Sequence, residues 1–213
     1  MLVVHHLNNS RSQRILWLLE ELGAPYEIKF YQRDATTNLA PPELVAVHPL
    51  GKSPVITDEA KGGDITIAES GAIVDYIQRK YGAGKLGAPA GEAAGEKYRE
   101  WLHYAEGSAM LPLMLNMYVM RLGEAGAPLH PRIQSEMANH LGYVDAALAG
   151  KDWLQGEFTA ADVQMSFVGE VARAFGQTAT HKNIGAWVER FQARPAYLRA
   201  LEKGGAYNLG PAK

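Results

Sequence analysis

Three short polar turns carry the side chains of this chain that could bind a charged ligand or assist a nucleophile. The first, Asn9-Ser10-Arg11-Ser12, lies between an apolar segment and a helix-forming segment. A hydroxyl beside a helix N-terminus can donate a hydrogen bond to an anion, which the helix dipole also favours. Serine and asparagine are equally the residues that cap helices, so the turn by itself leaves both roles open.

The second turn is Lys52-Ser53-Pro54-Val55, in which Pro54 stands at the start of a predicted strand. Because proline has no backbone N–H, a strand that it opens has an unpaired backbone edge at that point. Such an edge can hydrogen-bond an extended peptide ligand as if the ligand were another strand. The alternative is a loop proline that only terminates a sheet edge.

The third turn is Glu69-Ser70-Gly71, at the predicted start of a helix. The exposed N–H groups and the dipole of a helix N-terminus attract a carboxylate. Ser70 adds a hydroxyl, and Glu69 can accept a hydrogen bond from an ammonium group. A ligand with a carboxylate and an α-amine would therefore fit both residues. The alternative is plain capping by Ser70, with Glu69 as a favourable acid near the helix start.

Other kinds of chemistry find little support in the composition. The chain has no cysteine, which excludes disulfides, thiolate metal sites and a cysteine nucleophile, so any reacting sulfur comes from a ligand. His5 and His6 are adjacent and would face opposite sides of a strand. His130, His140 and His181 lack the short spacing of metal ligands. We therefore expect no metal site.

A fourth polar pattern, Thr159-Ala-Ala-Asp162, precedes the apolar run "VQMSFVGEVARAF". A threonine three residues before an acid is typical of a capping box, here with aspartate in place of the usual glutamate. We expect Asp162 to hold the start of a buried helix rather than to take part in a reaction.

The charge balance and the chain start bear on partners and location. A formal net charge of -2 gives no reason to expect a nucleic-acid partner, because such binding depends on clustered Lys and Arg. No apolar run approaches the roughly 18 residues of a membrane span. The N-terminus lacks the basic start and the cleavage-like site of a signal peptide, so we expect a cytoplasmic protein without a membrane partner.

The elements that would position the three turns follow one another as strand, helix, strand, short helix, strand, strand and helix. Apolar residues recur at helical spacing between Ile15 and Leu22, which predicts the first helix. A strand–helix–strand run predicts a parallel crossover. The predicted strands are Leu2 to Leu7, Tyr26 to Tyr31, Val55 to Thr57 and Ile65 to Ile67.

A Gly- and Ala-rich segment at 83–91 is the predicted domain boundary. Beyond it the patterns predict only helices, and the first of them contains Pro112, where we expect a kink. These helices are Tyr98 to about Arg121, Pro131 to Leu148, Thr159 to Phe175, Ile184 to about Gln192, and Pro195 to Glu202. We therefore predict an α/β domain at 1–82 and an all-α domain at 92–213.

The order of these patterns resembles the cytosolic glutathione S-transferase family over nearly the whole chain. The residues that carry the resemblance are "NNSRSQRILWLLEELGAPYEI", "HPLGKSPVI", "IAESGAIVDYI" and "FTAADVQMSF". The chain is most similar to bacterial and fungal members with an Asn/Ser-rich catalytic turn. The resemblance implies an N-terminal thioredoxin-like βαβαββα domain that binds glutathione, an all-helical C-terminal bundle domain with a hydrophobic-substrate pocket, and a homodimer.

The resemblance also implies roles for the second and third turns, with glutathione as the co-substrate and no metal. Pro54 would be cis, and the backbone of Val55 would pair with the cysteinyl part of glutathione. Lys52 would meet the glycyl carboxylate, and Glu69-Ser70 would hold the γ-glutamyl end. The glutathione-binding residues implied in this way are Lys52, Ser53, Pro54, Val55, Glu69 and Ser70.

The resemblance places the thiol against the first turn. Ser10 is nearest to the position of the catalytic hydroxyl in serine-type members, and Asn9 or Ser12 could take that role. The turn contains no tyrosine, so the chain is not similar to tyrosine-type members. Gly71 stands where an arginine often follows the Glu-Ser pair, which removes one contact expected for the γ-glutamyl group.

The function implied is that of a glutathione transferase, which activates the glutathione thiolate for attack on small hydrophobic electrophiles, as in detoxification. Two alternatives stay open: glutathione-dependent reduction of peroxides or disulfides, and non-catalytic binding of glutathione or hydrophobic ligands. The predicted contacts to a hydrophobic substrate are Tyr104, Met110, Met114 and Tyr118. Ordinary helix packing or a dimer contact is the alternative for each of these four side chains.

Overall fold

The computed structural model describes residues 1–60 and 62–211 of the 213-residue chain. The chain divides into two compact units. One contains Met1–Gly87 together with the chain from Gln192 onward, and the other contains Ala88–Phe191. The three polar turns singled out in the sequence all lie in the first unit.

The first unit is built on a four-stranded mixed sheet. Its strands are β1 (Val3–Leu7), β2 (Glu27–Tyr31), β3 (Val55–Asp58) and β4 (Ile65–Ala68), in the spatial order β2-β1-β3-β4. β1 and β2 are parallel and are connected by α1 (Ser12–Leu22), whereas the other two strand pairs are antiparallel. The predicted parallel crossover is therefore confirmed, and β3 lies inside the sheet.

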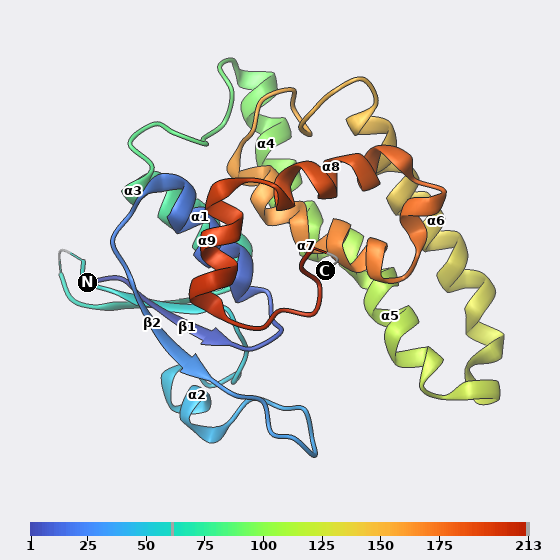
Figure 1. Ribbon diagram of the computed structural model, residues 1–213, viewed down its shortest axis with the longest axis horizontal. Coiled ribbons are helices and arrows are strands. Elements are labelled where there is room, and N and C mark those ends of the chain that lie inside the picture. Colours follow the sequence, from blue (N-terminus) through green and yellow to red (C-terminus); the bar gives the residue numbers. More distant parts are fainter. Residues whose placement is uncertain (61, 212–213) are drawn as a thin grey trace. The chain divides into compact units, whose positions relative to one another are not determined.

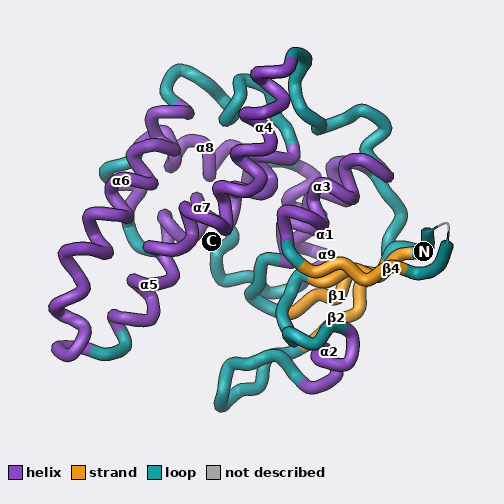
Figure 2. Tube along the Cα trace, turned by 180° about the vertical axis from the view of Figure 1, so that it is seen from behind, coloured by secondary structure: helices purple, strands orange, loops and turns teal. Residues whose placement is uncertain are grey.

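Helices lie on both faces of this sheet (Figure 1). α1 and α3 (Ser70–Tyr81) cover one face and α2 (Pro42–Val47) lies on the other, as the reverse view in Figure 2 also shows. Leu44 of α2 is fully buried and packs against Leu7 and Tyr31 of the sheet. The order of elements from β1 to α3 confirms the predicted thioredoxin-like βαβαββα arrangement.

α9 (Pro195–Gly204) belongs to the first unit, although the sequence pattern assigns Pro195 to Glu202 to the helical domain. The reason lies in α1, where every side chain from Ile15 to Leu19 is fully buried, so this helix needs a cover on the side away from the sheet. α9 supplies that cover: the rings of Trp17 and Tyr197 meet edge to face, 5.4 Å between centroids. The domain limits at 82 and 92 stay a prediction.

The second unit is entirely helical: all of its residues are described, and none of them lies in a strand. Its α-helices are α4 (Glu92–Tyr104), α5 (Met110–Met120), α6 (His130–Leu148), α7 (Ala160–Ala174) and α8 (Lys182–Gln192), of which only the last residue of α8 belongs to the first unit. Together with the first unit they confirm the predicted combination of an α/β part and an all-α part. Among the helices of the described residues, none has both the length and the apolar character that crossing a bilayer requires.

α4 and α5 occupy the stretch that the sequence predicts as one helix kinked at Pro112. The irregularity lies one turn earlier, in a π-helical turn over Ala105–Ala109. Pro112 has no N–H to donate to the carbonyl of Ser108, four residues before it. The backbone N–H of Met110 donates to the carbonyl of Ala105, five residues before it, which is the bond of a π-helical turn. The widened turn therefore contains the carbonyl that Pro112 cannot bond.

Candidate functional site

The turn between β1 and α1 is held from the side of β2. Asn9 has a left-handed backbone with φ 49°, a conformation that asparagine tolerates better than most residues. The Arg33 guanidinium donates to the backbone carbonyls of Asn8 and Asn9, at 3.2 and 3.3 Å. The side-chain oxygen of Asn9 accepts from the backbone N–H of Asn208 at 2.8 Å. Asn9 thus helps to anchor the turn.

Ser10 and Ser12 are brought together at the start of α1. Their hydroxyl oxygens lie 2.7 Å apart, and Ser10 Oγ also accepts from the Ser12 backbone N–H at 3.2 Å. Ser12 is completely buried and bonds His6 Nδ1 at 2.8 Å. Of these two predicted candidates for contact with the thiol, Ser12 is enclosed by the protein, which leaves Ser10 as the outer member of the pair.

The first and second turns meet at Ser53. The Ser53–Pro54 bond is cis, as the resemblance implies. Ser53 Oγ lies 3.2 Å from Ser10 Oγ, donates to the His5 carbonyl at 3.1 Å and accepts from the Leu7 backbone N–H at 3.4 Å. The Ser10 hydroxyl therefore lies directly beside the residue that precedes the cis proline.

The resemblance implies that the backbone of Val55 pairs with the cysteinyl part of glutathione, but Val55 lies on no open edge. Val55 is completely buried, and it pairs with His5 on one side and with Ala68 on the other. The expectation was wrong because β3 is an inner strand, and strand order cannot be derived from a proline and a short apolar run. Lys52, which is exposed, and Ser53 precede the strand ladder and lie outside it.

The third turn has an unusual helix start. Glu69 is exposed, with a left-handed φ of 69°, and it is the N-cap residue of α3 without forming a side-chain cap hydrogen bond. The capping role considered for Ser70 is not found either: Ser70 is the first residue of the helix and accepts from Arg14 Nη2 at 2.5 Å. The start of α3 therefore combines a strained exposed acid with N–H groups that its N-cap side chain leaves unbonded.

Arg14 was not identified from the sequence. It is buried within α1, and its bond to Ser70 joins the start of α3 to the helix that follows the first turn. One signal was available, because an arginine directly before the apolar run of α1 must be either exposed or paired. The sequence does not show which partner it has.

The two adjacent histidines face opposite sides of the sheet, as predicted. His5 bonds the Tyr31 hydroxyl at 2.9 Å and Thr57 Oγ1 at 3.2 Å. His6 bonds Ser12 and, through Nε2, the Gly204 carbonyl at 3.1 Å. Burial lowers the pKa of both imidazoles, and for His6 the Gly204 carbonyl opposes that shift. Within the described residues no cluster of His, Asp or Glu could hold a metal ion.

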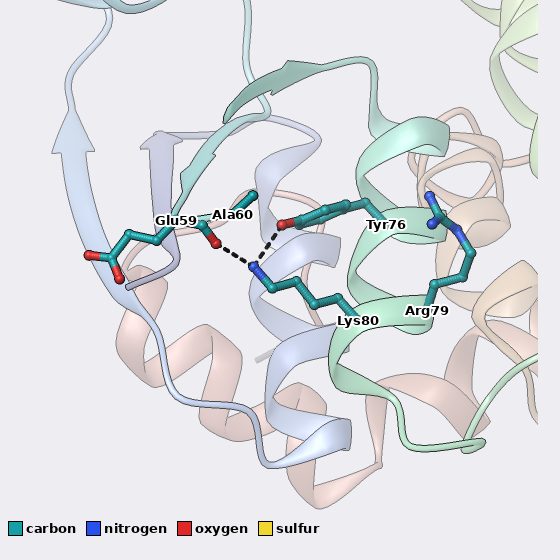
Figure 3. A pocket seen from close by; sticks show the side chains of 5 residues that line it. All are labelled: Glu59, Ala60, Tyr76, Arg79 and Lys80. Atoms are coloured by element: carbon teal, nitrogen blue, oxygen red, sulfur yellow. Dashed lines mark hydrogen bonds between the residues drawn. The ribbon is translucent and has the colours of Figure 1, made fainter. Parts of the chain in front are cut away.

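A second polar cluster lies at the C-terminal end of α3. Figure 3 shows Lys80 donating to the Tyr76 hydroxyl and to the Glu59 carbonyl, at 2.9 and 2.6 Å. Lys80 also contacts buried Asp58, which accepts from the hydroxyls of Tyr76 and Tyr81. Burial opposes ionisation of Asp58, but the bonds from Lys80 and the tyrosines hold its pKa below the ordinary value. These groups satisfy one another, which indicates a structural role.

The four residues predicted to contact a hydrophobic substrate lie in the second unit in different environments. Met110 is buried, Met114 is half-buried and Tyr118 is exposed. They repeat at intervals of four on α5 and so share one side of that helix. Tyr104 lies before the π-helical turn, and its hydroxyl bonds His140 Nδ1 of α6 at 2.7 Å. Tyr104 is thus committed to packing within its own unit.

The start of α7 confirms the structural role predicted for Asp162. Thr159 and Asp162 form a complete capping box. Asp162 also accepts from the Leu154 backbone N–H at 3.0 Å and from Trp187 Nε1 at 3.2 Å. Burial raises its pKa to about 6, although these hydrogen bonds oppose the shift.

Comparison with known sequences identifies one family. Residues 1–79 match the family described as glutathione S-transferase, N-terminal domain. The chain is 38% identical to glutathione S-transferase 3 of Schizosaccharomyces pombe, over 95% of this chain and 88% of that protein. It is 29% identical to glutathione S-transferase 1 of Saccharomyces cerevisiae, with 95% of each chain covered.

Solved structures agree with the sequence matches. A glutathione S-transferase from Actinobacillus pleuropneumoniae has a TM-score of 0.85 and 34% identity, covering 98% of this chain and 95% of that one. A glutathione transferase family member from Pseudomonas fluorescens, described with two glutathione bound, has a TM-score of 0.79 and 26% identity over 94% and 92% of the two chains. A transferase from Burkholderia graminis, described with two glutathione molecules per subunit, has the same score and identity over 94% and 87%.

Proposed function

The chain belongs to the glutathione S-transferase family, and from this premise we propose that it activates the thiol of glutathione and transfers it to small hydrophobic electrophiles. One observation carries the proposal for this particular chain. The Ser10 hydroxyl lies 3.2 Å from Ser53, the residue before the cis proline, which supports a single site made of the hydroxyl-bearing turn and the turn proposed to bind the tripeptide. A tripeptide thiol bound at the second turn would have its sulfur beside Ser10.

In this proposal the tripeptide lies extended across the second and third turns. Lys52 meets the glycyl carboxylate, and the backbone of Ser53 replaces Val55 as the partner of the cysteinyl group, because Val55 is already paired on both sides. The γ-glutamyl carboxylate binds the start of α3, including Ser70, where no N-cap side chain competes for the N–H groups. Glu69 accepts from the γ-glutamyl ammonium group.

Ionisation of the thiol explains only part of the expected rate. A free thiol with a pKa of about 8.5 is roughly 3% ionised at neutral pH. Lowering that pKa by about two units raises the thiolate fraction about 25-fold, while the lower basicity reduces nucleophilicity about 8-fold. The net gain is about threefold. The larger part of the acceleration must come from holding the sulfur and the electrophile together.

The second substrate is proposed to be apolar because of the side chains available on α5. Met110, Met114 and Tyr118 share one side of this helix, and methionine adapts its shape to varied ligands. Tyr104 is kept as a candidate contact whose hydroxyl already has a partner. We further propose that the protein is a cytoplasmic homodimer that acts in detoxification. Light scattering of the purified protein would test the oligomeric state.

The proposal is tested by glutathione consumption with a panel of aryl halides, epoxides and isothiocyanates. We expect turnover with at least one class, and we expect Ser10→Ala to lower kcat/KM by at least about threefold, the contribution of ionisation alone. Ser166→Ala is the matched control, because Ser166 is a buried serine of α7 that donates only to the Val163 carbonyl among the bonds described. Glutathione binding without turnover on any electrophile would contradict the proposal and favour a non-catalytic binding protein.

A second candidate function is reduction of disulfides or organic peroxides at the expense of two glutathione molecules. The observation in its favour is that two related structures, each 26% identical to this chain, are described with two glutathione bound. A reaction that ends in glutathione disulfide consumes two thiols, so binding of two glutathione molecules would suit it. Coupled oxidation of glutathione with hydroperoxides and small disulfides would distinguish this activity from transfer to electrophiles.

A further inference from the structure

A continuous chain of hydrogen bonds runs inward from Ser10 to the end of α9. Ser10 Oγ contacts Ser12 Oγ at 2.7 Å, and Ser12 Oγ contacts His6 Nδ1 at 2.8 Å. His6 Nε2 contacts the carbonyl of Gly204 at 3.1 Å. Ser10, Ser12 and His6 are all buried, so these groups exchange hydrogen bonds with one another.

The Gly204 carbonyl, at the inner end of this series of hydrogen bonds, determines where each proton lies. A backbone carbonyl can only accept, so Nε2 of His6 carries a hydrogen and, in the neutral imidazole, Nδ1 is an acceptor. Ser12 therefore donates its single hydroxyl proton to His6. The 2.7 Å contact between Ser10 and Ser12 then requires the proton of Ser10, although Ser53 Oγ is a second acceptor at 3.2 Å.

The positions of these protons determine whether Ser10 can donate a hydrogen bond to the ligand. While His6 is neutral, Ser10 has no proton left to donate, so it can accept from a thiol S–H but cannot stabilise a thiolate. If Nδ1 of His6 gains a proton, both hydroxyls reverse: His6 donates to Ser12, Ser12 to Ser10, and Ser10 becomes a donor facing the ligand. Ser10, Ser12 and His6 together can therefore stabilise a thiolate only when they hold one additional proton.

We propose that His6 is the internal acceptor of the thiol proton, which reaches it through Ser10 and Ser12. The S–H bond of bound glutathione breaks and its proton goes to Ser10 Oγ. The original Ser10 proton moves to Ser12 Oγ, and the original Ser12 proton moves to His6 Nδ1. The products are a thiolate that accepts from Ser10 and an imidazolium at His6, with no proton lost. His6 is thus a positioning residue, and the inference rests on the function proposed above.

Two opposing effects act on the charge of His6: burial lowers its pKa, and the bond to the Gly204 carbonyl raises it. The described side-chain interactions of His6 are with Ser12 from α1, Phe30 from β2 and Gly204 from α9. The Gly204 carbonyl is at the C-terminal end of α9, where the helix dipole favours a cation. His6 also lies among the residues that line a cavity of about 400 Å³.

The described bonds of the charged groups on the elements around His6 lead away from its ring. On α1 these bonds join Arg14 to Ser70, Glu20 to Arg199 and Lys203 of α9, and Glu21 to Arg194. On β2, Lys29 lies over the ring of Tyr31. None of these described bonds places a charged group on the His6 ring.

The test measures the protons released to the buffer and the thiolate formed in the same titration. Glutathione is titrated into the wild type at neutral pH, by calorimetry in two buffers of different ionisation enthalpy, and the thiolate is followed by ultraviolet difference absorbance. We expect thiolate to form with close to no proton released to the buffer. His6→Gln should still bind glutathione, but its thiolate fraction should fall severalfold, by up to about 25-fold if the thiol pKa returns to about 8.5, or each thiolate should release one proton.

His5→Gln is the matched control, because His5 is the neighbouring buried histidine with two hydrogen bonds on the other face of the sheet. It should behave as the wild type. Nitrogen-15 spectra of the wild-type complex provide a measurement that needs no variant, and they should show His6 protonated on both nitrogens when thiolate is present.

The outcomes separate this inference from the proposed function. Thiolate formation in the wild type with one proton released per thiolate, or beside a neutral His6, overturns the relay while leaving glutathione binding intact. Binding of glutathione as the neutral thiol also overturns the relay. The absence of any binding at millimolar glutathione overturns the proposed function and the relay with it.

Discussion

The first turns of α7 and α3 differ in how their backbone N–H groups are capped. At α7, Thr159 and Asp162 close a capping box, and Asp162 further accepts from Leu154 and Trp187. At α3, the N-cap residue Glu69 forms no side-chain cap and is exposed with a left-handed backbone. A helix start that serves only stability binds its N–H groups with its own N-cap side chain, whereas one whose N-cap side chain makes no such bond, beside a strained residue, is available to a ligand.

The largest effect should come from opening the closed helix start. Asp162→Ala leaves the N–H groups of Leu154, Thr159 and Trp187 without their buried acceptor. We expect a loss of about 3–5 kcal/mol in the free energy of unfolding, measured by urea denaturation. Asp162→Asn should lose less, because its amide oxygen still accepts. A variant as stable as the wild type would show that the two helix starts do not differ in this way.

The same carboxyl should give stability a pH dependence. Burial raises the pKa of Asp162 from an ordinary value of 3.8 to about 6, so between these values the folded state holds more protons than the unfolded state. Stability from this group therefore falls as pH rises from about 4 to 6, by at most about 3 kcal/mol. As pH rises from about 4 to 6, the urea midpoint of the wild type should therefore fall toward that of Asp162→Asn. A constant difference would contradict the assignment.

At the open helix start, a change should affect binding rather than stability. Glu69→Gln removes the negative charge that is proposed to meet the γ-glutamyl ammonium. We expect the Kd for glutathione to rise roughly 10- to 100-fold, the range of a lost charge-assisted hydrogen bond, with little change in the free energy of unfolding. Glu43→Gln is the control, an exposed acid in the first turn of α2. An unchanged Kd would remove Glu69 from the proposed site.

The smallest effect should be a gain in stability. Glu69 has φ 69°, a conformation that costs a residue with a side chain more than it costs glycine. We expect Glu69→Gly to increase the free energy of unfolding by about 1 kcal/mol while weakening glutathione binding. Calorimetric titration and urea denaturation of the same preparation would measure both. A loss of stability would mean that relief of backbone strain is outweighed at this position by the greater freedom that glycine gives the unfolded chain.

Local sequence patterns were sufficient to predict much of the fold of this protein. The order of strands and helices, the parallel crossover, the capping box at Thr159 and Asp162, and the opposite directions of His5 and His6 follow from periodicity and short-range geometry. Each of these depends on residues close together in the chain, so the sequence alone contains the information.

What only the tertiary structure decided involves residues far apart in the chain. Strand order put Val55 inside the sheet, and packing against α1 brought α9 to the first unit. The same packing set the Gly204 carbonyl against His6. A hydrogen bond between residues separated by nearly the whole chain leaves no periodic trace, because it depends on which surfaces meet when the elements pack.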